Sequence, residues 1–175
     1  MNQPKQITFS YEKRLQNETV QTKLLQLLSL CDDDFEPTLS SSRLKEQKHA
    51  TKEDKLKEYL REKKESHGWL FIWDEENLIG FVNFESFDGS DEAIVSKLKE
   101  KEIKGDDTLF IDTMAFLPQY RKQGFGQQLY HEFENIVFEK GKKKIVLRSA
   151  SMNNETQMHL FQKQGYRLLY EARRP

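Results

Sequence analysis

The sequence predicts an α/β domain built on a mixed β-sheet. Two apolar strands that read as a hairpin are followed along the chain by strand, helix, strand, helix and strand. The helical segments repeat apolar residues three and four apart, whereas the strands are short apolar runs. A length of 175 residues suits one compact core and leaves little room for a second. We therefore expect a single domain spanning residues 1–175.

Composition excludes several classes of function. Lys plus Arg (28) almost balance Asp plus Glu (29), so a net charge of -1 gives no general attraction to nucleic acid or anionic membrane. No apolar run approaches the ~20 residues of a membrane span, and the first residues lack the apolar core of a signal peptide. A soluble, cytoplasmic protein is expected. Cys31 is the only cysteine, which excludes an internal disulfide and a cysteine-based metal cluster; at the end of an apolar helix it is more often packing than a nucleophile.

In the first half of the chain we expect an extended piece containing Ile7 and Phe9. An amphipathic helix follows over Thr19 to Leu30, with Val20, Leu24, Leu27 and Leu28 at helical spacing. The stretch "CDDDFEPTLSSSR" then forms a polar loop. A second, surface helix is expected from Lys52 to Glu65, with a narrow buried stripe of Leu56, Tyr59 and Leu60.

Strands dominate the middle of the chain. "GWLFIWDEENLIGFVNFES" predicts strands Trp69 to Trp73 and Leu78 to Glu85 around a short polar turn. The segment from Phe87 to Asp107 suggests a short inserted helix. "TLFIDTMAFLP" is a further strand, closed by Pro118.

The last third predicts a long helix ending near Gly141, with an apolar stripe of Phe125, Leu129, Phe133 and Val137. "KKIVLRSA" is a strand, "NNETQMHLFQKQG" a helix stopped by Gly165, and "YRLLYEA" a final strand.

The junction "LPQYRKQGFGQQLYHEF" joins a strand directly to this long helix. The first N–H groups of a helix lack intrahelical partners, and the helix dipole adds positive potential there. Gly124 and Gly126 remove the Cβ atoms that would keep a diphosphate from those donors, while Arg121 and Lys122 supply positive charge. A simple tight turn is the alternative.

Two other phosphate-binding motifs do not match these residues. Gly126 is followed by Gln127-Gln128, which argues against a nucleotide-triphosphate loop. Leu129 stands where a dinucleotide fingerprint needs its third glycine, which argues against that motif.

These residues resemble the GCN5-related N-acetyltransferases (GNAT family). That family's pyrophosphate motif is Arg or Gln, two residues, Gly, one residue, then Gly or Ala, and residues 121–126 match it in full. A later signature also matches in spacing, through Asn154, Leu160-Phe161 and Gly165-Tyr166. The resemblance implies a GNAT-like acyl-CoA acyltransferase fold, with about six or seven strands splayed at the cofactor cleft and about four flanking helices.

The resemblance also implies acetyl-CoA as co-substrate, with no metal. The strand end would meet the pantetheine arm, the glycine loop the pyrophosphate, and Asn154 the far side of the cleft, although Asn154 can equally be a helix N-cap with Gln157. Phe161 occupies the position where many members carry a tyrosine thought to protonate the leaving thiolate. The cofactor-binding residues implied are Met114, Ala115, Phe116, Arg121, Lys122, Gln123, Gly124, Phe125, Gly126, Asn154 and Phe161.

Acetyl transfer to a primary amine needs a neutral nucleophile and a stabilised oxyanion, for which N–H groups near Ala115 and Phe116 are candidates. Asp112 on the central strand is the first candidate base, against the alternative of a structural or outward-facing carboxylate, and Glu85 is the second candidate. The sequence assigns no catalytic role to the histidines, nor to Tyr166 and Tyr170.

The acceptor amine is left open between polyamine, aminoglycoside, peptide N-terminus and lysine. The loop Asp32 to Arg43 and the insert Phe87 to Asp107 would flank its cleft, and the acidic loop residues could attract a cation. The competing hypotheses are an acyl-CoA-binding sensor without turnover and, more weakly, a nucleic-acid partner for Lys142-Lys143-Lys144. A homodimer is compatible with exposed strand edges.

Overall fold

The computed structural model of the chain describes residues 6–31, 51–63, 68–86, 96, 100, 108–139, 144–147, 162–163 and 165. Within them, the side chains of residues 52, 63, 86, 108, 110, 112 and 144–147 are outside the description.

The described strands form one mixed sheet in the order β1-β2-β3-β4-β5. Its strands are β1 (Ile7–Glu12), β2 (Gly68–Asp74), β3 (Asn77–Ser86), β4 (Thr108–Phe116) and β5 (Lys144–Leu147). The first four pair antiparallel to their neighbours, and β5 joins β4 in parallel. The predicted α/β class and the hairpin β2–β3 are confirmed, because Glu75 and Glu76 form the turn between the two predicted strands.

A bulge interrupts the pairing of β3 with β4. Asn83 lies opposite Thr113, but the next residue, Phe84, lies opposite Ile111. Asp112 is therefore the extra residue on β4 and has no partner in the register with β3. Such an insertion bends a strand and increases its local twist.

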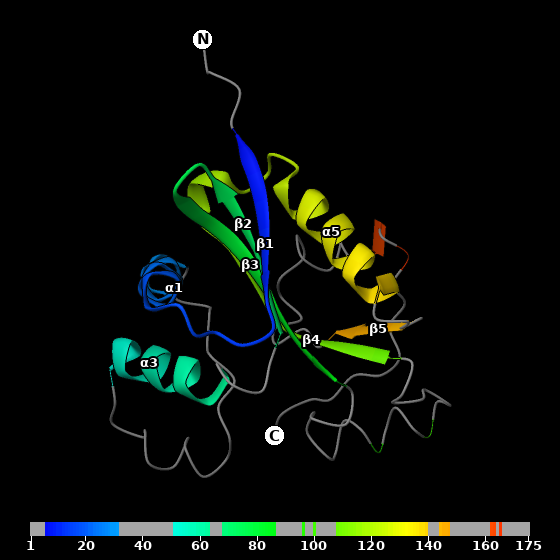
Figure 1. The fold of residues 1–175 in the computed structure, drawn as a ribbon, viewed down its shortest axis with the longest axis horizontal. Coiled ribbons are helices and arrows are strands. Elements are labelled where there is room, and N and C mark those ends of the chain that lie inside the picture. Colours follow the sequence, from blue (N-terminus) through cyan, green and yellow to red (C-terminus); the bar gives the residue numbers. More distant parts are fainter. Residues whose placement is uncertain are drawn as a thin grey trace.

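The helices cover the two faces of the sheet (Figure 1). Helices α1 (Glu18–Leu30) and α3 (Lys52–Lys63) lie on one face, where they enclose Trp69, Phe71 and Phe81. Helix α5 (Phe125–Glu139) lies on the other, against the side chains of Leu70, Ile72 and Val82. The predicted stripes are confirmed, with Val20 partly buried against the core and these side chains buried: Leu24, Leu27, Leu28, Leu56, Tyr59, Leu60, Phe125, Leu129, Phe133 and Val137.

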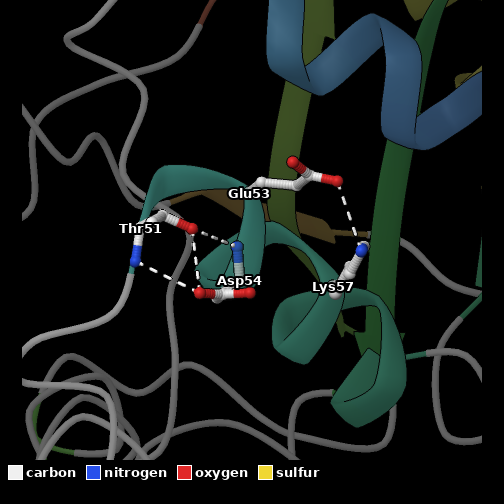
Figure 2. A network of polar contacts seen from close by, with 4 residues as sticks. All are labelled: Thr51, Glu53, Asp54 and Lys57. Atoms are coloured by element: carbon white, nitrogen blue, oxygen red, sulfur yellow. Dashed lines mark hydrogen bonds and ion pairs between the residues drawn. The ribbon is translucent and has the colours of Figure 1, made fainter.

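Helix α3 begins at a reciprocal cap (Figure 2). The Asp54 N–H donates to Thr51 Oγ1 at 3.2 Å, while Asp54 Oδ2 accepts from the Thr51 hydroxyl at 2.9 Å and from its N–H at 3.4 Å. An ion pair between Lys57 and Glu53 at 3.2 Å adds a contact one turn along. This capping explains why so charged a segment starts a helix at residue 52.

Some predicted elements fall outside the described residues. These are the polar loop of residues 32–43, the insert of residues 87–107 apart from the backbone of Ser96 and Glu100, most of the helix before Gly165, and the last strand. The expectations of about six or seven strands, about four helices and one domain over the whole chain stay predictions.

Candidate functional site

The predicted anion site lies at the N-terminus of α5. The Gln128 N–H donates to the Gly124 carbonyl at 3.2 Å. This hydrogen bond joins the first turn of α5 to the loop before it. The N–H groups of Gly126 and Gln127, which come just before Gln128, make no hydrogen bond to a loop carbonyl among the described residues. A helix of 15 residues thus presents its positive end at an exposed loop.

The loop before α5 has an unusual backbone. Lys122 has φ of 62° and Gly124 has φ of 86°, whereas Gln123 between them has negative φ. Left-handed residues on both sides of Gln123 turn the backbone sharply, and N–H groups in such turns can converge on an anion. A Cβ built at Gly124 would meet nothing within 4 Å, so the space in front of this amide is open among the atoms of the protein. Sequence reasoning found Gly124 but had no signal for the left-handed Lys122.

The polar side chains of the loop bind backbone carbonyls. Arg121 donates to the Phe116 carbonyl from Nε at 3.2 Å and from Nη2 at 3.0 Å. The Gln123 side-chain amide donates to the Gln119 carbonyl at 2.7 Å. Arg121 therefore fastens the loop to the end of β4, a role that was not anticipated from its charge.

Tyr120 joins the loop to the β2–β3 hairpin. It ends the short 3-10 turn Pro118–Tyr120, and its hydroxyl donates to Asp74 Oδ2 at 2.9 Å. Its ring lies 6.0 Å from that of Phe125, the first residue of α5. Burial, followed by the hydrogen bond to Asp74 and the charge of Asp74, raises the pKa of Tyr120. No spacing rule in the sequence pointed to this residue.

The end of β4 carries the predicted pantetheine contacts, which are partly buried. The Leu117 N–H donates to the Ile79 carbonyl at 2.9 Å, so the backbone of Leu117 faces β3. Since backbone groups alternate along a strand, Ala115 also faces β3, while Met114 and Phe116 face away from it. The Phe116 ring lies over Gly80, where a Cβ would come within 2.5 Å of Phe116 Cδ1.

The two candidate bases lie on neighbouring strands although 27 positions separate them in the sequence (112 − 85). Asp112 is the bulge residue of β4, with its side chain outside the description, and Glu85 on β3 is 8% exposed and lies opposite Phe110. Two residues before Glu85 on β3 stands Asn83, which lies opposite Thr113 and is fully buried. Tyr59 of α3 donates from its hydroxyl to Thr113 Oγ1 at 2.8 Å, beside the bulge.

The remaining residues singled out in the sequence lie in the core, on the surface or outside the described residues. Cys31 is buried, with Sγ 3.9 Å from the Phe116 carbonyl oxygen, which agrees with packing. His131 is exposed on α5. The residues outside the described part are Asp32, Asp33, Asp34, Glu36, His49, His67, Lys142, Lys143, Asn154, His159, Phe161, Tyr166 and Tyr170.

Two searches of the described residues gave negative results. They contain no group of three His, Cys, Asp or Glu side chains placed to hold a metal ion. In the same part of the chain, the helices are too short or too polar to cross a membrane.

The chain resembles known proteins in its sequence pattern and in its fold. The family model described as the acetyltransferase (GNAT) family matches residues 25–166. A comparison with curated protein sequences gave no match.

Solved structures resemble the fold at low sequence identity. The aminoglycoside N-acetyltransferase AAC(6')-Iy, in complex with a bisubstrate analogue of CoA, has a TM-score of 0.62 and 13% identity, covering 97% of both chains. A ribosomal-protein-alanine N-acetyltransferase from Brucella melitensis has a TM-score of 0.60 and 14% identity, covering 97% of this chain and 98% of the other. The aminoglycoside 6'-N-acetyltransferase AAC(6')-Ih from Acinetobacter baumannii has a TM-score of 0.58 and 13% identity, covering 97% and 96%. At these identities the likeness concerns the fold.

Proposed function

The chain belongs to the acetyltransferase (GNAT) family, and on this premise we propose that it transfers the acetyl group of acetyl-CoA to a primary amine. The amine attacks the thioester carbonyl directly while both substrates are bound. The carbonyl carbon forms a bond to nitrogen, the bond to sulfur breaks, and the amine proton leaves as the thiolate departs.

The single observation that carries the proposal is the backbone at the start of α5. The N–H groups at the start of α5, the left-handed Lys122 and the open Gly124 support a donor surface at the positive end of the helix. A pyrophosphate fits such a surface because it accepts several hydrogen bonds and carries negative charge. Lys122 adds a cation at its rim.

Each part of β4 then has a place in the reaction. Met114 and Phe116 face away from β3, so their backbone groups are the candidates for contact with the pantetheine arm and the oxyanion. Ala115 faces β3 and supports them through the ladder. The described pairing joins Thr108–Ile111 of β4 to Lys144–Leu147 of β5, and we place the coenzyme beyond it, at the end of β4, in the proposed splayed cleft.

Asp112 and Glu85 are proposed as the base that takes the amine proton. The bulge at Asp112 is where β4 departs from regular pairing, and bulges often redirect a side chain next to an active site. Asp112 stays the first candidate. Asn154 and Phe161 are proposed to complete the coenzyme site from the later motif.

For the acceptor we propose a small molecule or a peptide terminus that carries a primary amine. The neighbours in fold are named for both kinds of acceptor, namely aminoglycosides and ribosomal-protein alanine. A cytoplasmic location, a possible homodimer and the absence of a nucleic-acid partner stay predictions.

The second candidate is an acyl-CoA sensor without turnover. Phe161 favours it, because this side chain has no hydroxyl with which to protonate a leaving thiolate. Calorimetric titration with coenzyme A, followed by measurement of thiol release from acetyl-CoA with a panel of amines, separates the two. Amine-dependent release above background supports the enzyme, tight binding without release supports the sensor, and absence of binding rejects both.

A further inference from the structure

Two buried polar atoms on the α3 face of the sheet have no hydrogen-bond partner. They are Asn83 Oδ1, an acceptor, and Trp69 Nε1–H, a donor, and both residues are 0% exposed. Buried polar groups in native proteins are nearly always satisfied, so each such atom calls for an explanation.

The orientation of the Asn83 amide is fixed by a neighbour. Its Nδ2 donates to the Gly68 carbonyl at 3.2 Å. Exchanging nitrogen and oxygen would place two acceptors against each other, so Oδ1 has to be the atom that points away from Gly68. The missing partner of Asn83 must therefore be a donor.

The position of Asn83 suggests which donor this is. Asn83 lies opposite Thr113 in the register and thus next to the bulge residue Asp112. Glu85, two residues later on the same strand, points to the same face because strand side chains alternate. Above them, the Tyr59 hydroxyl on Thr113 Oγ1 adds another polar group to a face that is elsewhere apolar.

We propose that Asn83 positions the acceptor amine, with Oδ1 accepting a hydrogen bond from its N–H. This inference rests on the proposed acetyl transfer and deepens it by naming a residue that selects an N–H donor. Trp69 Nε1 is itself a donor and cannot take this role, although it stands opposite Asn83 in the pairing of β2 with β3. The competing occupant is an internal water bonded to both side chains.

The test compares Asn83→Leu with Trp69→Phe in the thiol-release assay. Leucine keeps roughly the size of asparagine but removes the acceptor, so we expect KM for the amine to rise about tenfold, as for loss of one hydrogen bond to a ligand. The KM for acetyl-CoA should not change, because the coenzyme site is proposed at the loop of residues 121–126 and the end of β4. Trp69→Phe removes the other unpartnered atom and should leave KM for the amine as in the wild type.

Three results would overturn the inference. An unchanged amine KM in Asn83→Leu means that the atom does not contact the acceptor, and equal rises in both variants point to a bridging water. A wild type that binds coenzyme A but shows no amine-dependent release fails the proposed function, and the inference falls with it. If Asn83→Leu does not fold, Asn83→Val, which has no acceptor and carries a branched side chain suited to a strand, replaces it, with the same rise in the amine KM expected and an unchanged KM overturning the inference.

Discussion

The Tyr120 hydroxyl donates to Asp74 at 2.9 Å, which joins two residues 46 positions apart. The bond fastens the turn before the pyrophosphate loop to the tip of the β2–β3 hairpin, while the Tyr120 ring contacts Phe125 at the start of α5. One side chain therefore helps to place both the loop and the helix end that we propose to bind the coenzyme.

Tyr120→Phe should weaken coenzyme A binding about threefold to tenfold, because it removes this link and leaves the ring in place. Calorimetry with Tyr120→Phe, with Asp74→Ala, which removes the acceptor, and with the double variant checks this prediction. If the two residues act through their bond, the double variant will lose little more than either single one. Additive losses would show that they act independently.

Gly124→Ala should cost about 1 kcal/mol of stability, because φ of 86° is strained for any residue with a Cβ. It should also weaken coenzyme A binding, since the new methyl group occupies the open space in front of the donors. Gly124→Glu should weaken binding further through charge repulsion. Gly165→Ala is the matched control, because Gly165 has φ of 91° and an equally open Cβ position but lies outside the loop. Equal coenzyme A affinity in all four proteins would place the ligand elsewhere.

Arg121 should act mainly by holding the Phe116 carbonyl. Arg121→Gln keeps a side-chain donor, and the family motif accepts either residue, so we expect most of the affinity to remain. Arg121→Ala should lose about tenfold, as expected for roughly 1.4 kcal/mol. Calorimetry across a salt series is the check, because a direct phosphate contact would make binding by the wild type more sensitive to salt than binding by Arg121→Gln. Parallel salt dependence is the expected outcome.

Gly80→Ala should displace the Phe116 ring, because its Cβ would lie 2.5 Å from Phe116 Cδ1 and 3.0 Å from the Ala115 carbonyl oxygen. We expect a stability loss of about 1–3 kcal/mol and weaker coenzyme A binding. Gly68→Ala meets the Phe84 ring at 2.6 Å and should lose similar stability with unchanged affinity. Denaturant unfolding and calorimetry on both variants separate the effects, and loss of affinity in both would show a general disturbance of the sheet.

Glu12 should make the protein less stable as the pH rises above the usual range of a carboxyl pKa. Burial raises the pKa of Glu12, and its Oε2 has no hydrogen-bond partner. The folded state then binds the proton more tightly than the unfolded chain, so this contribution is present at low pH and is lost as pH rises through the folded pKa. Glu12→Gln should raise Tm near pH 7 by about 1–2 °C, a small effect because the side chain is partly exposed. Thermal melts from pH 4 to 8 test this, with exposed Glu76→Gln as control; a constant difference across that range would contradict it.

Much of the fold could be read from the sequence because its signals are local. The stripe of Phe125, Leu129, Phe133 and Val137 repeats at the period of a helix, and a helix with such a stripe has one face to bury. The hairpin turn at Glu75 and Glu76 separates two apolar runs, so it too could be predicted from neighbouring residues in the sequence. The glycine spacing likewise pointed to the loop at residues 121–126.

Long-range and conformational features could not be read in this way. Nothing in the composition says that Arg121 turns back to Phe116, that Tyr120 reaches Asp74, or that Lys122 adopts a left-handed backbone. The β4 bulge at Asp112 depends on how two strands pair, which is a property of both strands together.

By itself, the sequence determined the class of the fold, the stripes that become the core and the spacing of the phosphate-binding loop. Each of these depends on residues a few positions apart, whose periodicity and backbone preferences act before any distant contact forms. Only the tertiary structure decided that Asn83, Thr113 and Tyr59 meet on one face and that Asn83 is left with an unpartnered oxygen. Sheet pairing and helix packing bring these groups together from three elements, and burial then makes a missing hydrogen bond costly.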